Sequence, residues 1–158
     1  MSENIVEIYG EYFRRAVEEI STELLDIKLN DLSGKEDRIS IHGKKLDVII
    51  GMTGDYKGRL LLESTEESAR TITEIMNFGT LERESDLYLY MGEFANILSG
   101  RAITFINNSN QKKIIRLTPP AIFSGVDLEI TTPNIEFINL CFGKDDLHIR
   151  LNIGFGGV

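Results

Sequence analysis

The chain has few of the residues on which metal, thiol or disulfide chemistry depends. Its 158 residues include one Cys, two His and no Trp. Cys141 cannot form an internal disulfide, and its place in the apolar segment INLCF predicts a small buried hydrophobe in a reducing compartment. His42 and His148 have no cysteine or second histidine near them in the sequence. We therefore expect neither a bound metal nor a histidine-activated thiol.

Positive charge and long apolar runs are also scarce. Seventeen Lys and Arg against 25 Asp and Glu give a formal net charge of -8. This balance argues against nucleic acid or an anionic membrane surface as partner, because both are bound through a surplus of basic residues. No apolar run approaches the roughly 18 residues that span a bilayer. The first residues, MSENIVEIYGEY, have neither region of a secretory signal. We therefore expect a cytoplasmic protein.

The familiar glycine-rich and nucleophile motifs are missing as well. The sequence contains no P-loop, no dinucleotide glycine fingerprint and no Gly-x-Ser-x-Gly segment. We expect no organic cofactor. A hydrophobic content of 42% with 27% charged residues is ordinary for a globular protein, and the length fits one domain over residues 1–158.

The order of periodic segments predicts an α+β domain. Helical periodicity covers 4–24, 66–77 and 85–107, with Ser64 and Glu67 as a capping box for the second helix and Gly79 as its stop. Alternating apolar residues predict strands at 25–32, 112–117, 126–131, 135–142 and 147–155, a hairpin over 46–63 and a proline turn at 118–125. Short connections favour an antiparallel sheet with the helices on one face. Each half begins with a long helix followed by strands, which hints at an internal pseudo-two-fold repeat.

The segment 85–107 is the longest amphipathic helix that the sequence predicts. One apolar stripe recurs at steps of three and four: Leu87, Met91, Phe94, Ala95, Leu98, Ala102 and Phe105. A second stripe carries Leu89, Glu93, Asn96 and Gly100, so that a carboxylate and a carboxamide are neighbours on one face. A glycine inside a helix costs about 1 kcal/mol relative to alanine and often marks a close approach. By itself the Glu-x-x-Asn pair is also compatible with two solvated side chains.

Three positions and their flanking segments resemble the CheC/CheX/FliY family of chemotaxis phosphatases. The family pattern is Asp or Ser, three residues, Glu, two residues, Asn, twenty-two residues and Pro. Glu93, Asn96 and Pro119 match it in spacing. The segments IIGMTGDYKGRLLLESTEESA, GEFANILSGRA and LTPPAIFSG are also similar to CheX. One Glu-x-x-Asn motif rather than two makes the chain closest to CheX. Leu89 departs from the pattern, because the family has Asp or Ser there.

This resemblance implies hydrolysis of the aspartyl-phosphate on a CheY-type response-regulator receiver domain. Asn96 would position the attacking water, Glu93 would pair with the receiver's lysine, and Leu89 and Gly100 would contact the receiver. The receiver would hold the Mg²⁺. A homodimer joined through sheet edges is expected. The alternative that Leu89 leaves open is a non-catalytic CheX-like module, which docks a receiver or serves in a signalling or flagellar assembly.

Overall fold

The structure is a computed structural model that describes residues 4–34, 41–109, 114–130 and 135–156. Its helices are α1 (Ile5–Ile20), the π-helical η1 (Ser21–Leu25), α2 (Glu66–Met76) and α3 (Ser85–Ser109). Its strands are β1 (Asn30–Asp31), β2 (Lys44–Gly54), β3 (Lys57–Thr65), β4 (Ile115–Leu117), β5 (Ala121–Val126), β6 (Glu136–Lys144) and β7 (Leu147–Gly156).

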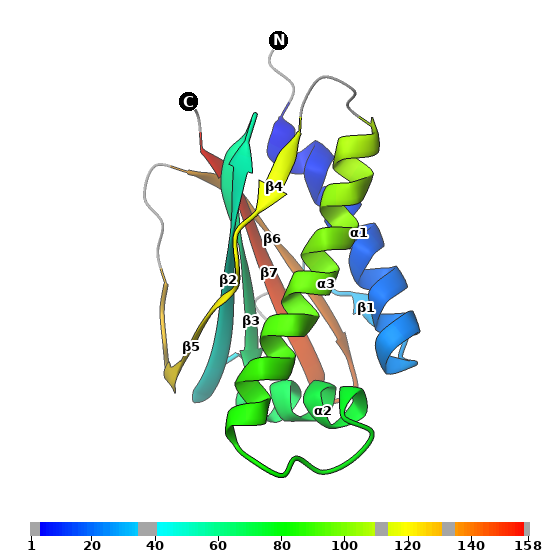
Figure 1. Ribbon diagram of the computed structural model, residues 1–158, viewed down its shortest axis with the longest axis vertical. Helices are drawn as coiled ribbons and strands as arrows, with labels where there is room; N and C mark the ends of the chain where they lie inside the picture. The colour runs from blue at the N-terminus through cyan, green and yellow to red at the C-terminus, as the bar shows by residue number, and fades with distance from the viewer. Residues whose placement is uncertain (1–3, 35–40, 110–113, 131–134, 157–158) are drawn as a thin grey trace.

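All strand pairs are antiparallel, and they form one sheet in the order β1-β6-β7-β3-β2-β4. β5 pairs with the first half of β2, next to β4 on the same side of that strand. Helices α1 and α3 lie side by side over one face, and α2 crosses the end of the sheet where α3 begins (Figure 1). The predicted α+β class, the antiparallel sheet and the helices on one face are therefore confirmed.

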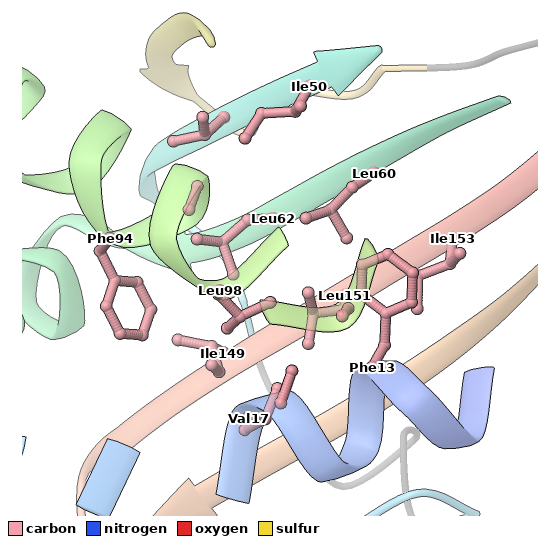
Figure 2. Close-up of a cluster of buried hydrophobic side chains, with 14 of the residues drawn as sticks. Phe13, Val17, Ile50, Leu60, Leu62, Phe94, Leu98, Ile149, Leu151 and Ile153 are labelled. Carbon is pink, nitrogen blue, oxygen red and sulfur yellow. The ribbon is translucent and has the colours of Figure 1, made fainter. Parts of the chain in front are cut away.

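The core lies between this sheet face and the helices. Alternate residues of the strands point towards α1 and α3, as the period of two requires. Figure 2 shows the centre of this cluster, which contains Phe13, Val17, Ile50, Leu60, Leu62, Phe94, Leu98, Ile149, Leu151 and Ile153. The predicted apolar stripe of the long helix is buried here except for Phe105, which is only partly buried. The lone Cys141 is buried too, as predicted.

Three predicted segments differ from the structure. Of the strand predicted at 25–32, only Asn30–Asp31 pairs, because the helical segment runs on to Leu25 and Asp26 turns the chain with φ of 53°. The predicted turn 118–125 contains β5, a strand on the outer side of β2. Of the described part of the strand predicted at 126–131, only Val126 belongs to a strand, as the last residue of β5, because Asp127 bends the chain with φ of 50°.

The ends of α2 also differ from the prediction. Thr65 is the N-cap, and its hydroxyl accepts a hydrogen bond from the Ser68 amide at 3.1 Å. Ser64 instead belongs to β3, where its hydroxyl donates to the Leu46 carbonyl at 2.9 Å. At the C-terminal end Phe78, with φ of 57°, precedes the predicted stop Gly79, which also has a positive φ, of 156°. Ser64 is part of a strand because β3 pairs with β2. A local sequence motif does not reveal this pairing.

A cluster of charged side chains is buried on the sheet face opposite the helices. Lys45 Nζ contacts Glu63 Oε1 at 3.0 Å and Asp47 Oδ2 at 3.6 Å, and Arg150 Nε donates to Glu63 Oε2 at 2.5 Å. Neither oxygen of Asp47 accepts a hydrogen bond from the described residues. Burial raises the pKa of Asp47 to about 6, and the positive charge of Lys45 offsets part of this rise.

We predict that Asp47→Asn makes the stability less dependent on pH. The folded pKa of Asp47 lies above its ordinary value of 3.8, so its contribution is complete below about pH 4 and is lost as the pH rises through 6. The variant should therefore be more stable than the parent at pH 7.5, by roughly 1–3 kcal/mol, with little of this difference left at pH 4. Urea unfolding at several pH values measures this. A difference that grows towards acid pH would contradict the assignment.

Candidate functional site

The first half of α3 is fixed by contacts on both of its sides. Tyr88 Oη lies 3.2 Å from Ser124 Oγ on β5, and Tyr90 Oη donates to Asn77 Oδ1 at the end of α2 at 2.8 Å. One turn after Tyr88, Gly92 faces β5 so closely that an added Cβ would lie 3.0 Å from Ile122 Cδ1. A larger residue at 92 would push the strand away from the helix. These contacts fix how far α3 is rotated about its axis.

The second half of α3 is tied to α1 and β4. Arg101 donates from Nη1 to Glu19 at 3.0 Å and from Nη2 to Glu23 at 2.8 Å, and its hydrogen bond lowers the pKa of Glu23. We had no reason from the sequence to pair Arg101 with α1. Asn107 donates to the Ile115 carbonyl at 3.0 Å and accepts from the Ile115 amide at 2.9 Å. The helix is thus a fixed platform.

The predicted site stripe faces away from the core along this platform. Leu89 is 68% exposed, Glu93 and Asn96 are exposed, and Gly100 is half-buried. They recur at steps of four, three and four residues, so they lie in line along one face. The structure therefore brings the predicted residues together on an accessible surface.

Within the described ranges, the side chain of Glu93 has no cationic partner. No hydrogen bond or ion pair joins the side chain of Glu93 or of Asn96 to any other described residue. Its helix neighbours at three and four positions are Tyr90, Leu89, Asn96 and Ile97, none of them charged. Carboxylates on α1 and α2 differ, because several of them pair with arginines. The carboxylate is therefore available to a cation from outside the chain.

The pair has a defined chemical capacity. A carboxamide can donate one hydrogen bond and accept another, so it can orient a water molecule without adding charge. A carboxylate can hold an ammonium group in a charge-assisted hydrogen bond. Within the residues that the structure describes, no group of three or more His, Cys, Asp and Glu side chains is arranged to hold a metal ion. The geometry suits positioning of a reactant supplied by a partner.

Gly100 has no close neighbour within the chain. A Cβ added there would meet no heavy atom within 4 Å outside the helix. The close approach expected from a helix glycine occurs instead at Gly92, which the sequence analysis did not single out. The small residue at 100 thus has no role in internal packing.

Phe78 was also missed at the sequence level. It follows α2 with φ of 57°, and its side chain is 98% exposed. The signal that could have revealed it is the Asn-Phe-Gly end of the helical pattern, where an apolar residue stands just before the expected glycine.

Solved structures with this architecture define the class. The chain superposes on the chemotaxis protein CheX from Vibrio vulnificus with a TM-score of 0.80 at 17% identity, covering 97% of this chain and 99% of that one. CheX in the CheX-CheY-BeF3-Mg²⁺ complex from Borrelia burgdorferi gives 0.73 at 22% identity, covering 94% and 98%. Thermotoga maritima FliY gives 0.64 at 15% identity, covering 98% and 91%. The fold is that of CheX and its CheC-like and FliY relatives.

The chain belongs to the CheX family. The family model described as "Chemotaxis phosphatase CheX" matches residues 47–142, which is more than half of the chain and includes all of α3. A search of curated protein sequences gives no match. Among the described residues, no helix has the length and apolar character needed to cross a membrane.

We predict that Gly100→Ala stabilises the protein. The added methyl group meets open space, and alanine in a helix interior is favoured over glycine by about 1 kcal/mol. The Tm should rise by roughly 2–4 °C in differential scanning calorimetry. Gly92→Ala is the matched control, because its methyl group would press on Ile122 and much of the same gain should be lost. A lower Tm for Gly100→Ala would show that the site is packed in a way this structure does not show.

Proposed function

We propose that the protein hydrolyses the aspartyl-phosphate of a CheY-type receiver domain. The observation that carries this proposal is the adjacent Glu93 and Asn96, both exposed and both without a partner, on a helix that is fixed to two neighbouring elements. Membership of the CheX family and the CheX-CheY complex of a similar protein support it. The setting we propose is the cytoplasm, where such receivers are found.

Asn96 is the proposed water-positioning residue. The acyl phosphate on the receiver is already activated, and the receiver supplies the Mg²⁺ that neutralises its charge. The Asn96 carboxamide would hold a water in line with the phosphorus–oxygen bond to the receiver aspartate. The water oxygen attacks phosphorus, the bond to the carboxylate oxygen breaks, and the water's protons remain with inorganic phosphate and solvent. A neutral carboxamide suits this task because phosphate oxygens do not repel it.

Glu93 is the proposed anchor. Its carboxylate would accept a charge-assisted hydrogen bond from the receiver's lysine and hold α3 in register over the phosphate. Gly100, two turns further along, would let the receiver backbone approach the helix. Both roles use the exposed stripe and require no movement of α3.

Leu89 favours a second candidate function. An apolar residue stands one turn before Glu93, where the family pattern has Asp or Ser, and it is 68% exposed. A surface of this kind suits a module that binds a receiver, or a signalling or flagellar partner, without catalysing hydrolysis. Leu89→Ser separates the two: a gain of phosphatase activity would favour a docking role for the natural protein.

We predict that Asn96→Ala removes most of the phosphatase activity and leaves binding nearly unchanged. The side chain is exposed, so its loss should change the free energy of unfolding by no more than about 0.5 kcal/mol. Because it acts on the transition state, the single-turnover rate of phosphate loss should fall by about 10²-fold or more. The rate is measured on phosphorylated CheY-type receivers from the same genome. A variant as fast as the parent would exclude this role for Asn96.

Glu93→Ala is the comparison variant for the same assay. Removal of an anchor for the receiver's lysine should weaken binding as well as rate, whereas Asn96→Ala should affect the rate alone. Binding is measured by titration against a receiver carrying beryllofluoride as a stable phosphoryl mimic. Equal losses of affinity in the two variants would mean that the roles are not divided as we propose.

We also propose that the protein is a homodimer. β5 pairs with β2 on one side only, and no described strand pairs with its other edge. An unpaired edge with the exposed Phe123 and Val126 suits pairing with a second copy. Light scattering at micromolar concentration should therefore give the mass of two chains, and Phe123→Lys should lower it to one. A parent protein that is monomeric under these conditions contradicts the proposal.

A further inference from the structure

Phe78 is unfavourable for the stability of the fold in two ways, through its positive φ and through its exposed ring. Its amide donates to the Ile75 carbonyl at 3.2 Å, and the Gly79 amide donates to the Glu74 carbonyl at 3.0 Å, which is the usual closure of a helix by a left-handed residue. Glycine is the residue that this position favours, because it has no Cβ to oppose the positive φ. The phenyl ring is 98% exposed, so packing does not compensate for the strain.

The residue before Phe78 is joined to the helix that carries Glu93 and Asn96. Asn77, directly before it, accepts the hydrogen bond from Tyr90 on α3, which is the residue after Leu89. α2 and the start of α3 lie at the same end of the molecule, as Figure 1 shows. Tyr88 and Leu89 are exposed at 39% and 68%. We define Phe78, Tyr88 and Leu89 as the apolar rim.

Electrostatic attraction cannot be the main source of affinity at this face. The stripe carries one charge, the carboxylate of Glu93, and no cation. Arg101, in the turn after Asn96, is neutralised by Glu19 and Glu23. The chain has a formal net charge of -8, and because the receiver's own Mg²⁺ would neutralise the phosphorylated carboxyl, the receiver's lysine is the one charge proposed to attract the stripe. Binding must therefore draw on contacts that bury apolar surface.

We infer that the apolar rim is the docking surface for the receiver domain and determines which receivers are bound. This inference rests on the proposed function for the identity of the partner. The rim is continuous with the Glu93–Asn96 pair, since Leu89 lies one turn before Glu93 on the same face. A receiver seated over the pair covers Leu89, and its side facing the end of α2 covers Phe78. The receivers selected are those that carry an apolar side chain beside the phosphorylated carboxyl. This side chain lies opposite Leu89, the position at which the family pattern has Asp or Ser.

The test is a titration of the full-length protein against receivers carrying beryllofluoride. Leu89→Ser and Phe78→Gly should each raise the Kd by about tenfold, a change typical of losing one central apolar contact. Ile114→Ser is the matched control: Ile114 is 52% exposed beyond the opposite end of α3, and its removal should leave the Kd unchanged. Phe78→Gly has a second readout, because relief of the positive φ should raise the Tm while affinity falls. A residue with a merely structural role would not show these two changes in opposite directions.

The outcomes distinguish the rim from the catalytic proposal. If the two rim variants bind more weakly and the control variant binds as the parent does, the result supports the apolar rim as the docking surface, whether or not the parent hydrolyses the phosphate. Unchanged or tighter binding of both variants overturns it, even if the parent is an active phosphatase. Absence of binding to every receiver from the same genome also overturns it. Loss of hydrolysis in Asn96→Ala depends on none of these results.

Discussion

The packing of one face of α3 against the sheet and α1 is the constraint on which the site depends. Leu87, Met91, Phe94 and Leu98 are buried along this face, and their burial fixes the rotation of the helix. Successive residues of a helix differ in direction by about 100°, so a slip of one residue would turn Glu93 and Asn96 out of the exposed sector. The hydrogen bonds of Tyr88 and Tyr90 to elements on opposite sides prevent such a rotation. The core thus determines where the site points.

Several residues on and near the exposed face of α3 break local rules of protein structure. Glu93 is an unpaired carboxylate, Gly100 is a helix glycine with open space around it, Leu89 is an exposed leucine, and Phe78 is a left-handed phenylalanine. Each reduces stability by a small amount or contributes nothing to it. Such violations are expected where a residue serves a partner and not the fold. Three of them, Leu89, Glu93 and Gly100, lie in line with Asn96 on α3, and this grouping is a stronger indication of function than any of them separately.

The sequence predicted the elements whose signal is local and strong. Helical periodicity placed α3 within two residues of its observed end, and alternation found the β2–β3 hairpin, β6 and β7. β5 was missed because Pro119 and Pro120 stand before it and because pairing with β2, some seventy residues earlier in the chain, makes it a strand. The ion pair of Arg101 with Glu19 on α1 and the packing of Gly92 next to Ile122 were missed for the same reason, because each depends on a partner distant in the chain. The sequence could predict that Glu93 and Asn96 are exposed side by side, because one helix carries both. It could not predict the exposure of Phe78, which lies in a connection whose conformation depends on how two helices pack.

An apolar docking surface has a kinetic consequence for a phosphatase. A contact that binds the phosphorylated and the free receiver equally raises affinity for both, and it does not accelerate the chemical step. Product then leaves slowly unless another contact distinguishes the two states. In the proposed arrangement Leu89 and Phe78 cannot distinguish them, because they are apolar and lie beside the phosphate and not on it. Discrimination must therefore come from a contact closer to the phosphoryl group, such as the one proposed between Glu93 and the receiver's lysine. In this arrangement Leu89 and Phe78 contribute to affinity alone, Asn96 contributes to turnover alone, and Glu93 contributes to both.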